Sequence, residues 1–193
     1  MKIGLYGGTF DPIHHGHLIL ARAARERFEL DQIVFIPAAI SPHKLATSPT
    51  PATLRWEMIL ASIDGEPHFS ADDIELHRDG PSYTHDTALA YREKYCDAKL
   101  FYFIGADNLP ALHTWHRIGE LQQLVTLAVL DRNSDASSSE VSAANFPTVF
   151  GRFDISASNI RNRVANGLSI RYLVTPAVDE IIRRHHLYQT PNH

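Results

Sequence analysis

The residues best suited to chemistry form one run near the start of the chain, Gly7 to His17, which reads Gly-Gly-Thr-Phe-Asp-Pro-Ile-His-His-Gly-His. It follows the short apolar run 3–6, which predicts a β-strand, and it precedes a helix-compatible stretch. Glycines let a ligand approach the backbone closely, and the first N–H groups of a helix attract anions. His14 and His17 are three residues apart, so both can face one side of that helix start. The run therefore predicts a phosphate site at the first strand–helix turn.

Other chemistries are less well matched by this run. Neither the Walker A motif nor the G-x-G-x-x-G fingerprint is present, which argues against a P-loop NTPase and an ordinary dinucleotide dehydrogenase. His14, His15 and His17 could ligate a metal, but Asp11 is the only nearby carboxylate at ligand spacing. We therefore expect no metal bound by protein ligands here, and a metal-dependent hydrolase remains an alternative.

A second set of phosphate donors is predicted late in the chain, in the run Ile-Ser-Ala-Ser-Asn-Ile-Arg at 155–161. Ser158 is expected to cap a helix that ends at Asn166-Gly167, because Gly commonly follows a helix C-terminus. Hydroxyl and N–H groups at a helix start, with Arg161 one turn inside, make a suitable anion site. An ordinary serine cap with a solvated arginine is the plainer interpretation of the same residues.

The chain between these motifs alternates strand-like and helical segments. Strands are expected at 32–36, 99–104 and 126–130, with a looser candidate at 69–76. Further helices are expected at 50–63 capped by Thr50, at 82–95 capped by Ser82 or Thr84, and at 175–185 opened by Thr175-Pro176. Residues 132–147 are rich in Ser, Asn and Ala and predict a surface loop.

This alternation predicts an α/β, Rossmann-like, doubly wound fold with a mostly parallel sheet and helices on both faces, in a single domain over residues 1–193. Ligands of such folds bind beyond the carboxyl ends of the strands. The segments expected to form the site are 7–17, 37–44, 105–116 and 151–161.

The two phosphate motifs resemble those of the nucleotidyltransferase superfamily. Residues 9–17 resemble its Gly/Thr-x-Phe-x-Pro-x-His-x-Gly-His signature, and residues 155–161 resemble its Ile-Ser-x-Thr-x-Ile-Arg motif, with Ser158 in place of Thr. The resemblance implies that His14, His17 and Arg161 act on the phosphates of ATP. The full set of ATP contacts that it implies is Gly8, Thr9, Phe10, His14, His17, Ser156, Ser158 and Arg161.

Further matches, which cover nearly the whole chain, resemble the bacterial nicotinate mononucleotide adenylyltransferases. Residues 35–44 resemble their Pro-Pro-His-Lys/Arg segment, with Ser41 in place of the first Pro; 82–84 resemble Ser-Tyr-Thr; 104–107 resemble Ile-Gly-x-Asp; and 114–116 resemble Thr-Trp-Tyr, with His116 in place of Tyr. The acceptor-binding residues implied by this resemblance are His43, Lys44, Thr84, His85, Asp107, Trp115 and His116. Trp115 would stack on the pyridine ring.

The activity implied is transfer of AMP from ATP to nicotinate mononucleotide, which gives deamido-NAD and pyrophosphate, with Mg²⁺ brought in on the ATP. The acceptor phosphate is ionised near neutral pH, so no general base is needed. Alternatives are the same chemistry on nicotinamide mononucleotide or phosphopantetheine, and a non-catalytic nucleotide sensor. A carboxamide acceptor would want a hydrogen-bond acceptor in its pocket, and no clear candidate carboxylate stands out there.

The bulk composition sets the remaining expectations. The chain has 193 residues, 44% of them hydrophobic, and a formal net charge of −4, which argues against a nucleic-acid partner. Cys96 is the only cysteine, so no Cys-based metal site is expected. No apolar run is long enough for a membrane span. We therefore expect a cytoplasmic protein without membrane contact, and the sequence does not indicate its oligomeric state.

Overall fold

The computed structural model describes residues 1–39, 49–78, 80–131, 146–151 and 153–189. Within these ranges the strands form one six-stranded sheet in the order β3-β2-β1-β4-β5-β6, and every neighbouring pair is parallel. The strands are β1 (Lys2–Gly8), β2 (Gln32–Pro37), β3 (Phe69–Ala71), β4 (Lys99–Gly105), β5 (Thr126–Asp131) and β6 (Thr148–Phe150). The predicted α/β fold with a parallel sheet is confirmed.

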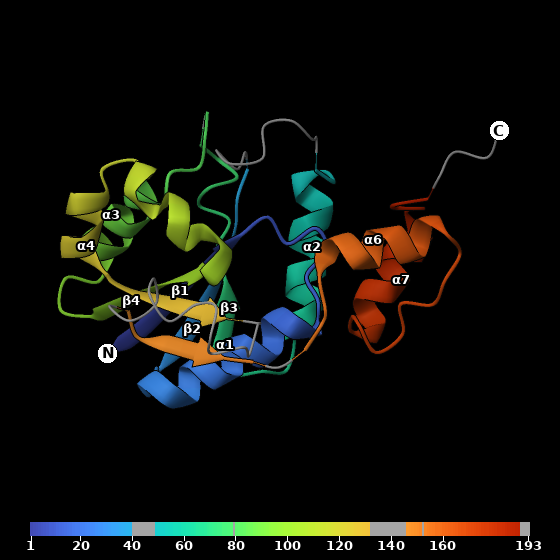
Figure 1. The fold of residues 1–193 in the computed structure, drawn as a ribbon, viewed down its shortest axis with the longest axis horizontal. Helices are drawn as coiled ribbons and strands as arrows, with labels where there is room; N and C mark the ends of the chain where they lie inside the picture. The colour runs from blue at the N-terminus through green and yellow to red at the C-terminus, as the bar shows by residue number, and fades with distance from the viewer. Residues whose placement is uncertain (40–48, 79, 132–145, 152, 190–193) are drawn as a thin grey trace.

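Helices cover both faces of this sheet (Figure 1). They are α1 (His15–Phe28), α2 (Ala52–Ile63), α3 (Thr84–Lys94), the 3₁₀ helix η1 (Ala106–Thr114), α4 (Ile118–Leu124), α6 (Ala157–Ala165) and α7 (Pro176–Arg184). None of the helices in the described ranges has the length and apolar character that crossing a membrane requires. The strand arrows point towards the end of the molecule where α2 and α6 lie, so the carboxyl ends of the strands face these helices.

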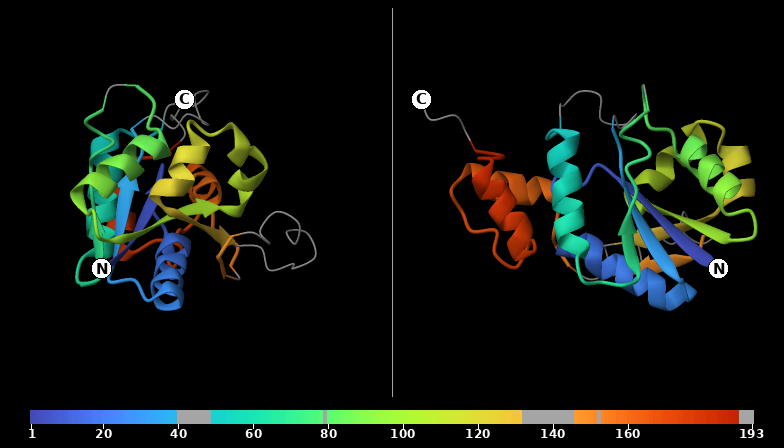
Figure 2. Two further views of the ribbon diagram at one scale, coloured as in Figure 1. Left: turned by 90° about the vertical axis from the view of Figure 1, so that its left-hand side faces the viewer. Right: turned by 180° about the vertical axis from the view of Figure 1, so that it is seen from behind.

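Helices lie on opposite faces of the sheet, as Figure 2 shows, and each face carries its own apolar cluster. Successive residues of a strand point to opposite faces, and the continuous apolar runs of the central strands bury both. One face packs on α3, η1 and α4 through Leu5, Ile36, Tyr102, Val129, Ala88, Leu112 and Leu121. The other packs on α1, α2, α6 and α7 through Phe35, Phe103, Leu20, Met58, Ile160 and Ile181. The site therefore rests on strands held rigidly from both sides.

Several helix starts differ from the sequence-based expectations. Thr50 does not cap α2, because the residue at the cap position is Pro51 and no side chain bonds the helix start. Neither Ser82 nor Thr84 caps α3; Tyr83 holds that position without a side-chain hydrogen bond. The prediction for α7 is confirmed, since Thr175 Oγ1 accepts a hydrogen bond from Val178 N at 3.3 Å.

The cap of α6 lies two residues earlier than expected. Ser156, not Ser158, holds the cap position, and its Oγ accepts a hydrogen bond from Asn159 N at 3.2 Å. The predicted end is confirmed, because the helix stops at Ala165 and Gly167 has a φ of +67°. The shift places Ser158 inside the first turn of the helix, where its hydroxyl faces another partner.

Three elements were not predicted, and one was predicted too long. The sequence analysis missed η1, α4 and β6, and the strand expected over 69–76 covers only Phe69–Ala71. Asp72 ends β3, because Ile74 N donates to its Oδ1 at 2.9 Å in a local turn. Most of the loop expected at 132–147 lies outside the described residues.

Candidate functional site

The first turn lies between β1 and α1, at the middle of the sheet where the strand order changes direction. Its most constrained residue is Phe10, which is buried and has a φ of +49°, an uncommon value for a bulky side chain. The Phe10 ring packs edge-on against Tyr6 and His17, with centroids 5.5 Å and 5.1 Å away. The packing of Phe10 on these two rings therefore fixes the turn.

The two outer histidines of the first motif lie together at the start of α1. His14 is the cap residue, and its ring stacks on that of His17 with centroids 3.7 Å apart. The backbone N–H of His14 donates to His17 Nδ1 at 3.2 Å. A ring nitrogen that accepts carries no proton, so in neutral His17 the proton is on Nε2. His17 therefore presents an N–H donor at the end of its ring.

Gly7, at the end of β1, leaves no room for a side chain. A Cβ on Gly7 would lie 1.9 Å from the hydroxyl oxygen of Tyr102 on β4. A side chain at Gly7 is thus excluded by the protein itself, whereas close approach of a phosphate to this backbone stays a prediction. Burial raises the pKa of Tyr102 far above its ordinary value, so this hydroxyl stays protonated at neutral pH.

The second motif is joined directly to the first. Arg161 Nη1 donates to the backbone oxygen of Asp11 at 2.7 Å, and Nη2 donates to Ser158 Oγ at 3.3 Å. Ser156 caps the start of the same helix, where the first N–H groups have no intrahelical acceptor. The structure therefore brings together the two predicted phosphate motifs, which are about 150 residues apart in the sequence.

A cavity of about 250 Å³ lies beyond the carboxyl ends of β1 and β4. It is lined by residues from the first turn, from the start of α3 and from the end of η1, with the β-strand ends between them. Of the residues predicted to bind substrates, those on its wall are Gly8, Thr9, Thr84, Asp107, Trp115 and His116. His43 and Lys44 lie outside the described residues. The acceptor motifs and the first turn therefore share one cavity.

A second cavity of about 220 Å³ adjoins the start of α6. Its wall includes Asp107, which also lines the first cavity, together with Ser156 and the buried Asp131. Asp107 thus lies between a space beside the acceptor motifs and a space beside the second phosphate motif. The two cavities therefore share Asp107 as part of their walls.

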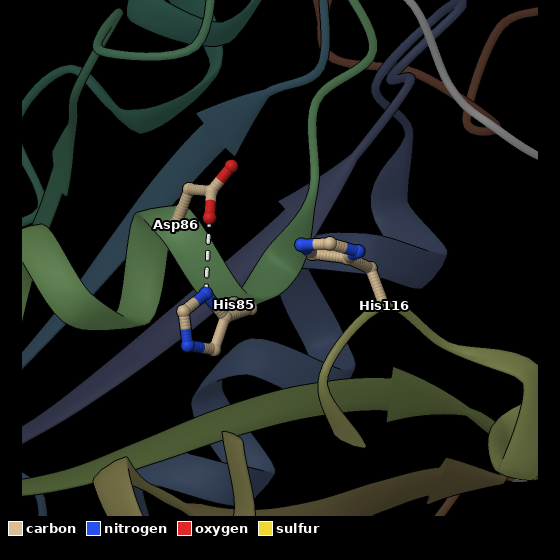
Figure 3. A group of neighbouring side chains, drawn as sticks. All are labelled: His85, Asp86 and His116. Atoms are coloured by element: carbon tan, nitrogen blue, oxygen red, sulfur yellow. Dashed lines mark hydrogen bonds and ion pairs between the residues drawn. The ribbon is translucent and has the colours of Figure 1, made fainter. Parts of the chain in front are cut away.

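His85 and His116 face each other beside the first cavity, together with Asp86 (Figure 3). His85 is only 2% exposed, and its Nδ1 lies 3.0 Å from Asp86 Oδ1. The His116 ring lies against Tyr83, with centroids 4.5 Å apart, and edge-on to His85 at 6.0 Å. One ligand atom from each of His85, Asp86 and His116 lies within 4.8 Å of the others.

This is the one group of at least three potential metal ligands that the described ranges contain. His14, His15 and His17 form no such group, so nothing in their geometry supports the hydrolase alternative. The cluster that does exist belongs to the acceptor side of the site, since His116 lines the first cavity.

The expectation that no carboxylate stands in the acceptor pocket is wrong. Glu75 follows β3, is only 3% exposed, and lies on the wall of the first cavity. Its Oε1 accepts a hydrogen bond from Thr87 Oγ1 at 2.7 Å, and Arg78 Nη1 donates to the same hydroxyl at 2.8 Å. Glu75 lies within the strand expected over 69–76, so the sequence pattern gives no sign of a carboxylate in the cavity wall.

Glu75 makes a pH-dependent contribution to the free energy of unfolding. Burial raises the pKa of Glu75, although hydrogen bonds from Thr87 and Ser82 and the charge of Arg78 act against the rise. A carboxyl with a raised folded-state pKa favours the fold while it is protonated, and that contribution is lost as the pH rises through the folded pKa. The side chain of the Glu75→Gln variant stays neutral. As the pH rises from 4.5 to 8, this variant should therefore become more stable relative to the unaltered protein.

Urea unfolding of both proteins at these two pH values measures the effect. The difference in free energy of unfolding between Glu75→Gln and the unaltered chain should move in favour of the variant at the higher pH. An equal difference at both values would mean that the carboxyl titrates alike in the folded and unfolded states.

The chain is similar to known proteins along nearly its whole length. Residues 5–163 match the cytidylyltransferase-like family. A probable nicotinate-nucleotide adenylyltransferase of Thermomicrobium roseum is 39% identical, over 98% of this chain and 92% of that protein. One of Shouchella clausii is 41% identical, over 99% of this chain and 98% of that protein.

The fold is shared with solved structures as well. The Plasmodium falciparum nicotinic acid mononucleotide adenylyltransferase complexed with NaAD matches with a TM-score of 0.80 over 97% of each chain, at 18% sequence identity. Such a distant likeness concerns the fold, whereas the relatives at 39% and 41% identity share almost the full sequence. The chain therefore belongs to the nicotinate-nucleotide adenylyltransferase family.

Proposed function

We propose that this chain transfers AMP from ATP to nicotinate mononucleotide, giving deamido-NAD and pyrophosphate. The observation that carries the proposal is the single cavity that joins Thr9 of the first turn to Thr84, Trp115 and His116 of the acceptor motifs. The relatives that are 39% and 41% identical to this chain are named as probable enzymes of this activity. A donor at the phosphate motifs and an acceptor in the cavity would meet at the carboxyl edge of β1 and β4.

The reaction needs positioning more than proton transfer. An oxygen of the acceptor's phosphate attacks the α-phosphorus of ATP, a new P–O bond forms, and the bond to the β-phosphate oxygen breaks to release pyrophosphate. The attacking oxygen is already ionised, so the protein has to align the two phosphates and offset the developing charge. We propose MgATP as the donor, with Mg²⁺ arriving on the phosphates and keeping part of its water shell.

The phosphate motifs supply the donors for this step. We assign His17 Nε2, His14 and Arg161 to the triphosphate, together with the N–H groups of the first turn at Gly8 to Phe10. Ser156 and Ser158 complete this set at the start of α6, where the helix dipole favours anions. A guanidinium has five N–H donors, so the contacts of Arg161 with Asp11 and Ser158 leave further donors for phosphate oxygens.

The acceptor's carboxylate is assigned to the start of α3. Thr84 and His85 are the first two residues of that helix, and the first N–H groups of a helix have no intrahelical acceptor. Trp115, half-buried on the cavity wall, would stack on the pyridine ring. His116 lies beside both and adds a second donor. Roles for His43, Lys44 and Asp107, and a cytoplasmic location, stay predictions of the sequence.

The test is pyrophosphate release from MgATP with nicotinate mononucleotide, nicotinamide mononucleotide and phosphopantetheine, assayed side by side with a reaction that lacks acceptor. We expect kcat/KM to be at least tenfold higher for the nicotinate form, as for a site that hydrogen-bonds a group the competitor lacks. A higher value for either other acceptor would overturn the assignment of α3. ATP binding without release in any reaction would support a nucleotide sensor instead.

A further inference from the structure

Asp11 is the point where three distant parts of the chain meet at the first turn. Its Oδ1 accepts a hydrogen bond from the hydroxyl of Tyr188 at 2.6 Å, and its Oδ2 accepts one from Thr50 N at 3.2 Å. Its backbone oxygen accepts from Arg161 Nη1 at 2.7 Å. The turn is therefore bound to the segment before α2, to α6, and to the segment that follows α7.

Thr9 and Asp11, the residues on either side of Phe10, are both held by hydrogen bonds from distant parts of the chain. Thr9 is fixed from the other side, since Arg55 Nη1 donates to its backbone oxygen at 2.7 Å. Arg55 is only 1% exposed and also donates from Nε to Thr50 O at 2.9 Å. A positive φ at a bulky residue persists when the surrounding structure over-determines it. The contacts on Thr9 and Asp11 supply that constraint for Phe10.

The hydrogen bond from the Tyr188 hydroxyl to Asp11 is retained at neutral pH. Burial, followed by the charge of Asp11 and the hydrogen bond to it, raises the pKa of Tyr188 far above the ordinary range. The hydroxyl therefore stays protonated and donates, and a hydrogen bond to a carboxylate is among the stronger kinds. The position of Phe10 bears on the phosphate site, since its ring packs on His17.

We infer that Tyr188 is a positioning residue for the donor substrate: through Asp11 it holds the first turn in the shape that receives the triphosphate. The inference rests on the proposed function for the identity of that substrate. Tyr188 itself touches no reacting atom in this account. Its loss should weaken the hold on MgATP and slow the chemistry more than it affects the acceptor, because Tyr188 does not line the acceptor cavity and most of that wall belongs to other segments.

The experiment compares Tyr188→Phe with Tyr91→Phe in steady-state kinetics. Tyr91 is a matched control, because its buried hydroxyl donates to the carboxylate of Asp72 at 2.5 Å on the opposite face of the sheet. We expect Tyr188→Phe to raise the KM for MgATP and lower kcat, with kcat/KM for MgATP down about tenfold, the effect of one hydrogen bond to a charged group. The KM for nicotinate mononucleotide should change less than twofold. Tyr91→Phe should leave the KM for MgATP within twofold, although it loses a similar contact.

A second variant and a direct binding measurement keep the result decisive. Asp11→Ala removes both side-chain oxygens, so the Tyr188 hydroxyl and Thr50 N both lose their acceptor. The double variant Tyr188→Phe/Asp11→Ala should be no more than twofold worse than Asp11→Ala alone, because the contact with Tyr188 is already absent from Asp11→Ala. Calorimetry with MgATP and no acceptor should show weaker binding for Tyr188→Phe.

The outcomes separate this inference from the proposed function. If the unaltered protein neither binds MgATP nor releases pyrophosphate, the proposed function itself is wrong. Unaltered protein that is active, with Tyr188→Phe equal to it in kcat and in affinity for MgATP, would overturn the positioning role alone. Equal losses for both substrates in Tyr188→Phe would indicate a general structural role and would also overturn it.

Discussion

Replacing His17 with alanine is expected to reduce kcat by about 10²- to 10³-fold, the usual effect of removing one donor that faces developing negative charge. Its ring nitrogen Nδ1 accepts from His14 N, so in neutral His17 the ring proton is on Nε2, the atom proposed to donate to phosphate. The change also removes the acceptor of a helix-start N–H group, which costs about 1 kcal/mol of stability. Pyrophosphate release and urea unfolding, measured on the same preparation, separate the two effects.

The neighbouring histidine is the control for this prediction. His15 is the first residue of α1, and its backbone N–H donates to Leu173 O at 2.9 Å, a bond that His15→Ala leaves in place. That variant should keep kcat within about threefold, because the half-buried side chain of His15 is not assigned to the phosphates. Unchanged turnover in His17→Ala would show that the ring does not act on the phosphates.

Replacing Arg161 with lysine should lower kcat/KM for MgATP by about 10²-fold or more, even though the charge is kept. Arg161 contacts Asp11 O and Ser158 Oγ through two different nitrogens. A lysine has a single ammonium and cannot reproduce a planar fork of donors. The loss combines weaker transition-state stabilisation with a looser join between the two phosphate motifs, so both kcat and KM should change.

Arg163 offers the matched comparison on the same helix. Its Nε donates to Ser169 O at 2.8 Å, in the connection that follows α6. Arg163→Lys should alter kcat/KM by less than twofold. If Arg161→Lys behaves like Arg163→Lys, the guanidinium of Arg161 has no part in binding the donor.

The sequence predicts those parts of the fold and of the site that depend on residues close together along the chain. The apolar runs at 32–36, 99–104 and 126–130 are strands, since each carries a local pattern of β-branched and aromatic residues. Thr9 follows β1, Thr84 opens α3, Trp115 and His116 follow η1, and all four do meet in one cavity. The rule that ligand sites gather at the carboxyl ends of parallel strands places such residues together.

What was missed depends on contacts between distant residues or on exact backbone geometry. Ser156 and Ser158 are equally good cap residues, and only the point at which the backbone turns helical decides between them. Glu75 enters the cavity because β3 ends early, which no short pattern reveals. The bond between Tyr188 and Asp11 spans 177 residues, so a single sequence gives no sign of it.

That span has a consequence for how the enzyme is made. Asp11 leaves the ribosome early, yet its partners Arg161 and Tyr188 are synthesised 150 and 177 residues later. Contacts of such long separation form late, since the chain between them must first be closed into a loop. The central strand and its turn therefore lack both contacts until residues 161 and 188 have been synthesised, and until then the nascent chain should bind MgATP more weakly than the folded protein.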